Sequence, residues 1–475
     1  MKSNLVGRLR EKAVLKEISD SDGSQFLALT GRRRVGKTYL IKSYFNDKID
    51  FDFSGILNAS QHDQLQNFQF ALTHHFKQYK KSNVVLNWLS AFKHLSLLLQ
   101  KTKKKRKQVV FIDELPWLDT HKSNFLAALD WFWNSWAVDQ NIVLIVCGSS
   151  TSWIINKLIN NKGGLHNRIT KRIHLEPFTL GETEDFLKQR GIALSRYQLL
   201  QTYMAFGGIP HYLKEIRKGE SAMQAIDRVC FKKSGLLVNE FDNLYKALFN
   251  NYQTHIKIIF ALSAKLKGLT RGEILAITKL SDGGTFTSIL EELEWCSFIT
   301  SQPSFGKVKK EILYRLTDEF SLFYLKFMYK KRNVNWQQLS SGNTWKSWSG
   351  YAFENICIKH VSQLKSAMGI SGVYTEESGF IYKGTKTKKG AQIDLVIDRN
   401  DGIINLCEAK FYNKEFSISK SYAGELKEKK DIFERVSATN KTVFLSMITT
   451  YGLNSNTHSN GLIQQEMDMN DLFAD

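Results

Sequence analysis

Residues 31–38 read Gly-Arg-Arg-Arg-Val-Gly-Lys-Thr, the spacing GxxxxGK[ST] that binds phosphate groups. An apolar run, Phe26–Thr30, precedes this loop, and a helical pattern, Thr38–Phe45, follows it. Glycines let the backbone wrap phosphates, while N–H groups and the helix dipole stabilise their charge. We therefore expect ATP here, with Lys37 reaching the terminal phosphates and Thr38 binding Mg²⁺. The predicted binding residues are Gly31, Arg32, Arg33, Arg34, Val35, Gly36, Lys37, Thr38 and Tyr39.

Two acids end a second apolar run, Val109–Asp113, where a buried strand is expected to stop. Asp113 is expected to bind the Mg²⁺ of the nucleotide, and Glu114 to orient and polarise the attacking water. Glu114 could instead cap the segment that follows it. Ser149 follows the next run, Ile142–Gly148, and its hydroxyl either bonds the water or terminal phosphate or forms an ordinary turn. Together these residues predict hydrolysis of ATP to ADP and phosphate.

A second set of charged residues lies near the C-terminus. Asp394 is on an expected strand, Ile393–Ile397, and a turn leads to the returning strand, Ile403–Ala409. Glu408 and Lys410 are two residues apart, so they should share one face. Two carboxylates can bind Mg²⁺, while an ammonium group can orient water and stabilise a developing phosphorane. The alternative is a salt-bridged face of an inactive scaffold.

The spacing of apolar residues along the sequence divides the chain into three regions. Up to about residue 175, short apolar runs alternate with amphipathic stretches, which predicts a parallel sheet covered by helices on both faces. The expected strands are Phe26–Thr30, Ile49–Ser54, Val109–Asp113, Ile142–Gly148 and Arg172–Leu175.

The second region, about 176–331, is mostly helical. Its later part has three helical patterns and then two strand-like runs, Phe298–Gln302 and Glu311–Leu316, an order typical of a winged helix-turn-helix. Gly283–Trp295 would be the recognition helix, although its acids disfavour phosphate contact. The third region, from about residue 345, combines a helix, Gly350–Leu364, with the C-terminal hairpin and predicts a separate α/β module.

The N-terminal motifs resemble the archaeal-type P-loop ATPases, which are related to the AAA+ and STAND classes. Besides GRRRVGKT, VVFIDE and VCGSS, the segment LVGRLRE carries Gly7 and Arg8, which the resemblance implies lie near the adenine. LHNRITKRIHLEPF resembles the segment with a finger arginine, here Arg168, and GGIPHYL resembles a GxP signature that includes Pro210. In such families the arginine often completes a neighbour's site, which implies a homo-oligomer. Arg168 could instead pair with a surface carboxylate.

Asp394, Glu408 and Lys410 resemble the core of PD-(D/E)xK nucleases, although no proline precedes Asp394. Glu354, on the helix before them, matches an acid that such folds often add, so the implied nuclease Mg²⁺ ligands are Glu354, Asp394 and Glu408. The expected fold is α/β: a P-loop ATPase core (1–178), a helical lid (179–250), a winged helix-turn-helix (251–333) and a restriction-endonuclease-like domain (345–475).

Composition points to the partner and the compartment. The 475 residues carry 66 Lys and Arg against 46 Asp and Glu, a net charge of +20 that favours DNA or another nucleic acid. Five scattered cysteines and no long apolar run predict a cytoplasmic protein without a membrane segment. Basic clusters are candidate contacts, or else solvated charge: Lys103–Lys107, Lys307–Lys310, and Lys383, Lys386, Lys388 and Lys389.

The functional prediction is an ATPase that acts on or with nucleic acid and carries a C-terminal metal-dependent nuclease. The alternative is a nucleotide-controlled regulatory switch whose nuclease-like part is an inactive scaffold.

Overall fold

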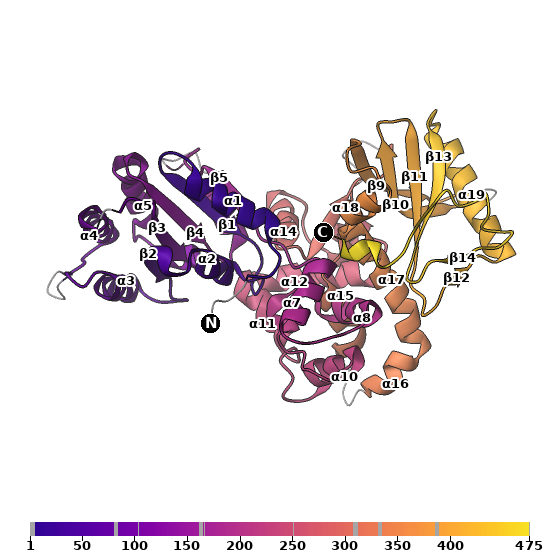
Figure 1. Ribbon diagram of the computed structural model, residues 1–475, viewed down its shortest axis with the longest axis horizontal. Coiled ribbons are helices and arrows are strands. Elements are labelled where there is room, and N and C mark those ends of the chain that lie inside the picture. The colour runs from indigo at the N-terminus through magenta and orange to yellow at the C-terminus, as the bar shows by residue number, and fades with distance from the viewer. Residues whose placement is uncertain are drawn as a thin grey trace. The chain divides into compact units, whose positions relative to one another are not determined.

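The chain forms two compact units, residues 1–176 and residues 177–475. The computed structural model describes residues 5–79, 84–102, 104–160, 165, 167–249, 251–306, 312–330, 335–384 and 389–474. Figure 1 colours the first unit indigo to purple and the second magenta to yellow. No helix within these ranges is both long enough and apolar enough to span a bilayer.

The first unit is built on a five-stranded parallel sheet of order β2-β3-β4-β1-β5. The strands are short apolar runs, and every residue of β3 and β4 is buried. Strand β4 separates β1 from β3, so the carboxyl ends of all three meet at one edge. The strand bounds are β1 Gln25–Thr30, β2 Ile49–Ser54, β3 Gln108–Asp113, β4 Ile142–Cys147 and β5 Lys171–His174.

One face of this sheet packs against an aromatic core that includes Phe26, Phe68, Trp88, Phe92 and Phe132. Capping side chains start two of the covering helices, Ser60 for α3 and Asn87 for α4. The helices of the unit are α1 Leu9–Asp20, α2 Lys37–Phe45, α3 Gln61–His75, α4 Trp88–Lys101, α5 Phe125–Ser135 and α6 Thr151–Ile154.

The second unit begins with helices: α7 Leu180–Gln189, α8 Arg196–Phe206, α9 Pro210–Leu213, α10 Ala222–Ile226 and α11 Glu240–Leu248. Three helices follow, α12 Tyr252–Ala264, α13 Arg271–Thr278 and α14 Gly284–Trp295. They accompany a small antiparallel sheet of order β6-β8-β7, with β6 at Leu269–Thr270, β7 at Ile299–Gln302 and β8 at Leu313–Leu316. Two short helices come next, α15 Glu319–Phe323 and α16 Trp336–Ser341.

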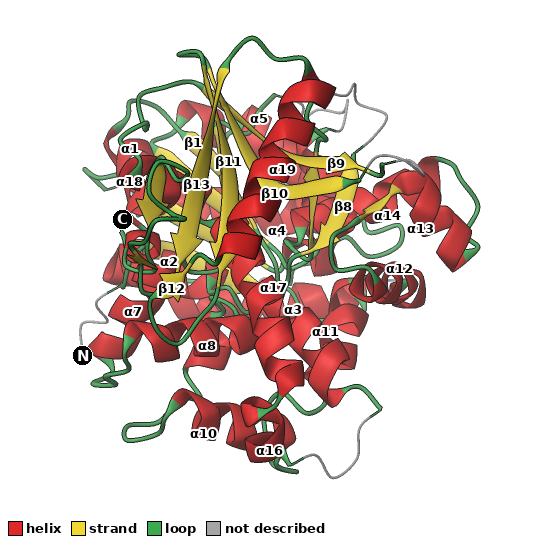
Figure 2. Cartoon of the chain, turned by 90° about the vertical axis from the view of Figure 1, so that its right-hand side faces the viewer, coloured by secondary structure: helices red, strands yellow, loops and turns green. Residues whose placement is uncertain are grey.

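The C-terminal part contains a mixed sheet of order β15-β13-β11-β10-β9. Strands β9, β10 and β11 are antiparallel, whereas β11, β13 and β15 are parallel. Helix α19 packs one face of the sheet through Leu426 and Phe433 (Figure 2). The bounds are α17 Asn343–Lys359, α18 Val361–Ala367, β9 Thr375–Tyr382, β10 Ala391–Arg399, β11 Ile403–Lys410, β12 Phe416–Ser417, α19 Lys420–Ser437, β13 Thr442–Thr449, β14 Leu453–Asn454 and β15 Gln465–Met467.

Residues 177–475 form one compact unit, and the expected helical lid, winged helix-turn-helix and C-terminal module within it stay predictions. Helix α17 connects parts of this unit, because it has buried residues on more than one side. Its Trp345 and Trp348 pack against Phe327, which lies well before the C-terminal part. His360, just after α17, accepts a hydrogen bond from the Leu180 N–H at 3.0 Å.

Candidate functional site

The phosphate loop joins β1 to α2, as the motif predicts. Gly31 and Gly36 have positive φ angles of 132° and 97°, and a side chain at Gly31 would clash with the Leu175 carbonyl. Arg34 also has a positive φ, 74°. The Lys37 ammonium donates to the Gly31 and Arg32 carbonyls, at 2.6 and 2.9 Å. Lys37 therefore lies across the loop in which phosphates are expected.

Beside this loop, the Thr38 hydroxyl donates to Asp113 Oδ2 at 2.6 Å. The other Asp113 oxygen accepts the Glu114 N–H at 2.9 Å. The two side chains predicted to share a Mg²⁺ ion are thus neighbours at the carboxyl edge of the sheet. Hydroxyl and carboxylate oxygens are the donors that Mg²⁺ prefers, so this set fits the ion.

Glu114 has a left-handed backbone, with φ 48°. Its Oε2 accepts two hydrogen bonds from Ser149, one from the N–H at 3.0 Å and one from the hydroxyl at 2.9 Å. Its side chain makes no capping hydrogen bond to the following turn, Leu115–Leu118. The structure therefore joins the acid and the hydroxyl of the two strand ends, and the capping alternative is wrong.

Cys147, the last residue of β4, is a contact residue that was not predicted from the sequence. Its buried thiol lies 2.7 Å from Asp113 Oδ1, and burial raises the pKa of this thiol well above its usual value. The one available signal was its position directly before the Gly-Ser-Ser turn, on the strand next to β3.

Arg8, expected near the adenine, is buried with a left-handed backbone that follows Gly7, which also has positive φ. Its guanidinium donates to the Glu176 carbonyl at 2.7 Å and to the Val35 carbonyl at 3.3 Å. Arg8 therefore braces the phosphate loop from outside, and a contact with adenine stays a prediction.

Arg168 is exposed and lies two residues before Thr170, whose hydroxyl accepts the Phe26 N–H at 3.0 Å. Phe26 is the second residue of β1, and the four residue steps from it to Thr30 span about 13 Å. Arg168 thus sits at the amino edge of the sheet, opposite the phosphate loop of its own chain. Its action on a neighbour stays a prediction.

The GGIPHYL segment lies in the second unit. Pro210 opens α9, and Gly208 passes so close to Phe178 that a Cβ would clash with the Phe178 backbone. The Phe178 N–H donates to the Gly208 carbonyl at 2.7 Å. This glycine therefore permits a backbone crossing, and a nucleotide contact for Pro210 stays a prediction.

The basic run before β3 has a structural role. Lys104 and Arg106 pair with the buried Asp50 carboxylate at 2.6 and 2.7 Å, and the Lys107 ammonium donates to the Ile18 carbonyl at 3.0 Å. These cations are therefore engaged rather than merely solvated. Lys389 pairs with Glu428 at 3.1 Å and Lys383 is exposed. Lys103, Lys307–Lys310, Lys386 and Lys388 lie outside the described residues.

In α14, two of the acids that weighed against nucleic-acid contact have internal partners. Glu292 accepts from His255 Nε2 at 2.8 Å, and Glu294 accepts the Ser301 N–H at 3.0 Å. Thr285 and Glu291 remain exposed. The exposed face of α14 therefore presents fewer free acids than its sequence suggests. Its contact with nucleic acid stays a prediction.

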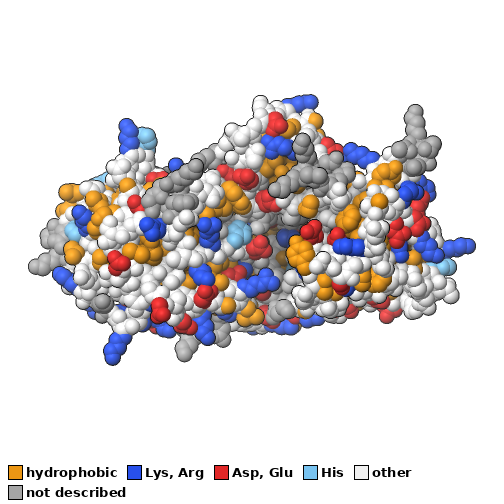
Figure 3. Space-filling model, turned by 90° about the horizontal axis from the view of Figure 1, so that it is seen from above, with side chains coloured by type: hydrophobic (Ala, Val, Ile, Leu, Met, Phe, Trp, Pro, Cys, Tyr) orange, Lys and Arg blue, Asp and Glu red, His pale blue; other side chains and the backbone are white. Residues whose placement is uncertain are grey.

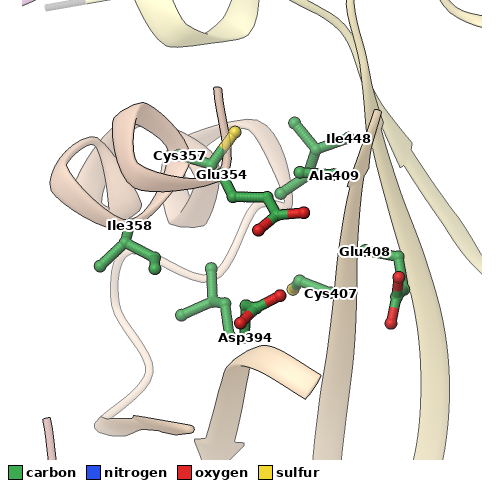
Figure 4. A pocket seen from close by; sticks show the side chains of 9 residues that line it. Glu354, Cys357, Ile358, Asp394, Cys407, Glu408, Ala409 and Ile448 are labelled. Carbon is green, nitrogen blue, oxygen red and sulfur yellow. The ribbon is translucent and has the colours of Figure 1, made fainter. Parts of the chain in front are cut away.

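A small pocket lies between α17 and the C-terminal sheet and is lined by Glu354, Asp394 and Glu408, with Cys357 and Cys407 (Figure 4). Its volume, about 10 Å³, suits one water molecule. Burial and the adjacent Asp394 carboxylate raise the pKa of Glu354 to about 8, so Glu354 is mainly protonated at neutral pH.

The predicted metal ligands do not converge. Asp394 Oδ1 accepts from Arg315 at 2.6 Å, Glu408 pairs with Lys429, and the Lys410 ammonium lies 4.8 Å from the Tyr422 ring centre. Figure 4 shows Glu354 and Asp394 on one side of β11 and the Glu408 carboxyl group on the other. Within the described ranges, no three His, Cys, Asp or Glu residues are arranged to hold a metal ion.

A bulge in β10 explains this departure. Between Ile393 and Val396 the pairing with β9 shifts by one residue, so both apolar side chains face the α19 core. Leu406 faces that same core, and by alternation so does Glu408. Asp394, inside the bulge, takes the α17 side instead. Glu408 and Lys410 therefore share one face, as expected, but the expectation that Asp394 lies alongside them is wrong.

Comparison with known proteins gives one family match and two similar proteins. Residues 5–216 match the family described as an ATPase domain predominantly from Archaea. An uncharacterized protein of Methanocaldococcus jannaschii is 24% identical over 432 residues, which cover 88% of this chain and 90% of that protein. The Walker-type ATPase of Pyrococcus abyssi has a similar fold, with a TM-score of 0.51 and 18% identity over 68% of this chain and 96% of that one. Residues 5–216 are therefore similar to an archaeal-type ATPase domain, and the chain shares the fold of a Walker-type ATPase.

Proposed function

We propose that this protein is a Mg²⁺-dependent ATPase whose nucleotide state controls its association with nucleic acid. The observation that carries the ATPase proposal is the hydrogen-bonded chain from Thr38 through Asp113 and Glu114 to Ser149, beside the phosphate loop. It joins the ends of β3 and β4 to α2.

Each group has a role in hydrolysis. Lys37 and the loop N–H groups bind the terminal phosphates, while Thr38 and Asp113 hold Mg²⁺. When bound, the ion neutralises charge that develops on the phosphates. Glu114 orients the attacking water and accepts its hydrogen bond.

Ser149 holds Glu114 in the arrangement seen here. Both hydrogen bonds go to the same Glu114 oxygen, so one carboxylate oxygen is occupied before a water molecule can bind it. We infer that nucleotide binding redirects the Ser149 hydroxyl to the water or the phosphate, which releases Glu114. Arg168, which lies away from its own phosphate loop, then completes the site of a second copy.

Nucleic acid is the proposed partner because the charge excess is uneven. Residues 1–176 contain 27 Lys and Arg against 14 Asp and Glu, so they carry +13 of the total +20. On the face in Figure 3 the basic side chains are interspersed with acidic ones, so the proposal rests on the charge excess of residues 1–176 and not on this face. The order of α12, α13, α14, β7 and β8 supports a winged helix-turn-helix as a second contact.

The C-terminal part has the order α17-β9-β10-β11-α19-β13, which supports the proposed restriction-nuclease-like fold. Its separated carboxylates favour the regulatory alternative over metal-dependent cleavage.

One experiment tests this proposal: ATP turnover with and without DNA or RNA, followed by electrophoresis of the nucleic acid. We expect turnover that nucleic acid alters and no cleavage. Lys37→Ala should lose turnover, whereas Lys42→Ala, a change at an exposed lysine of the same helix, should keep it. Equal ATP turnover by wild type and Lys37→Ala would show that the phosphate loop is not the ATPase site.

A further inference from the structure

We propose that Arg315 is the resident cation of the C-terminal carboxylate pocket, and that this pocket holds the β7–β8 hairpin instead of a metal ion. The proposal goes beyond the ATPase function, because it assigns a role to the second carboxylate set.

The first observation is the ion pair itself. Arg315 lies on β8, and its side chain is 3% exposed, while its Nη2 is 2.6 Å from Asp394 Oδ1. A buried guanidinium costs a large desolvation free energy unless a carboxylate and hydrogen bonds compensate it. Asp394 supplies the carboxylate through Arg315 Nη2, whereas Nε and Nη1 of Arg315 are buried without a hydrogen-bond partner among the described residues.

A continuous seam around the ion pair is the second observation. Gln302, the last residue of β7, donates to the Asp394 carbonyl at 3.1 Å. The Phe305 N–H donates to the Gly379 carbonyl at 2.7 Å, and the Gly379 N–H donates to the Pro303 carbonyl at 3.1 Å. The chain after β7 therefore pairs with the edge strand β9.

Apolar packing adds to these polar contacts between the hairpin and the C-terminal sheet. The Phe305 ring lies 4.9 Å from the ring of Phe433 on α19 and joins the core of the C-terminal sheet. The hairpin is thus held by charge, by backbone hydrogen bonds and by apolar packing. Residues 302–305 cannot contact a nucleic-acid backbone while they make these contacts.

The remaining donors do not offer an alternative metal site. Glu408 lies on the other side of β11 from Asp394 (Figure 4) and pairs with Lys429 of α19. The Lys410 ammonium lies over the ring of Tyr422, also on α19. A divalent ion at Asp394 would also lie next to the Arg315 guanidinium, and like charges at this distance repel strongly in a buried site. Asp394 is therefore better suited to its ion pair with Arg315 than to binding Mg²⁺.

Manganese binding tests the absence of the metal site. Mn²⁺ is titrated into the full, nucleotide-free chain and followed by electron paramagnetic resonance, in wild type and in Asp394→Asn. We expect the two titrations to coincide. A binding site present in wild type and lost in Asp394→Asn would overturn the proposal.

Amide hydrogen exchange tests whether the Arg315–Asp394 ion pair holds the β7–β8 hairpin on the C-terminal sheet; this contact is called the clamp below. Arg315→Gln should speed amide exchange in β7 and β8 by about tenfold or more, because a charge-assisted hydrogen bond is lost. Arg271→Gln is the matched control, since Arg271 pairs with the exposed Asp282, and should leave β7 and β8 unchanged. If Arg315→Gln does not fold, Asp394→Asn decides the question: faster exchange of the hairpin supports the clamp, and unchanged exchange overturns it. Neither measurement depends on ATP turnover.

Discussion

Ser149 donates both its N–H and its hydroxyl to a single oxygen of Glu114, at 3.0 and 2.9 Å. This relationship couples the ends of β3 and β4, the two strands expected to flank the terminal phosphate. We propose that nucleotide binding moves the Ser149 hydroxyl and frees this Glu114 oxygen for the attacking water. Hydrolysis should therefore depend on Glu114 much more strongly than nucleotide binding does.

The first prediction concerns Glu114→Gln. The amide keeps the size of the side chain but is a far weaker hydrogen-bond acceptor and cannot take a proton, so kcat should fall about a hundredfold or more. Affinity for a fluorescent ATP analogue should change little, because the phosphates are bound by the loop and Lys37. Glu17→Gln, at an exposed ion pair with Lys171, is the control. Wild-type kcat in Glu114→Gln would remove Glu114 from the mechanism.

The second prediction concerns the basic run before β3. Arg106 makes hydrogen bonds to both oxygens of the buried Asp50, so Arg106→Gln should lower the free energy of unfolding by about 2 kcal/mol. Urea unfolding followed by tryptophan fluorescence measures the change. Lys105→Gln, a change at the exposed neighbour, should have almost no effect on stability. Nucleic-acid affinity should be equal in the two variants, because each removes one charge; a selective loss in Arg106→Gln would show that this arginine binds phosphate directly.

The arrangement of side chains around the phosphate loop could be predicted from sequence because its parts are local. The phosphate loop is one contiguous motif, Asp113 ends one apolar run and Ser149 follows another, so a parallel sheet brings both to one edge. The individual side-chain contacts at that edge could not be predicted from the sequence. The thiol of Cys147 meets Asp113 only because β4 lies directly beside β3, which composition does not reveal.

The C-terminal site shows where such reasoning fails. A hairpin read with strict alternation places Asp394 and Glu408 on one face, but a single extra residue in β10 reverses that relationship. Arg315 is 79 residues earlier in the chain than Asp394 and carries no local signal of their contact. The joining of the predicted modules through α17 likewise depends on tertiary packing of tryptophans.

The third prediction is a pH dependence of stability that arises at His360. Its Nδ1 hydrogen-bonds the Ile356 carbonyl and its Nε2 accepts the Leu180 N–H, so the folded chain needs a neutral ring. Burial lowers the pKa of His360 from 6.5 to about 4. The unfolded chain therefore binds a proton near pH 6.5, and the folded chain only near pH 4. Stability present above pH 6.5 should fall as the pH drops through this window, by roughly 3 kcal/mol in all.

Urea unfolding at intervals from pH 7.5 to pH 4.5 checks this effect. His360→Gln, which can still accept the Leu180 N–H, should reduce the slope between pH 6.5 and pH 4.5. His458→Gln, at an exposed histidine, should keep the slope of wild type. An unchanged slope in His360→Gln would mean that other groups cause the acid sensitivity.

The fourth prediction concerns Arg168, which lies at the opposite edge of the sheet from its own phosphate loop. If it completes the site of a second copy, Arg168→Ala should lose turnover but still bind ATP. A mixture of Arg168→Ala with Lys37→Ala should then recover turnover, because one copy supplies an intact site and the other supplies the arginine. A mixture of Lys37→Ala with Glu114→Gln should stay inactive, since each copy is defective in the same site. Turnover by Arg168→Ala alone at the wild-type rate, at every protein concentration, would exclude the role in a neighbour's site.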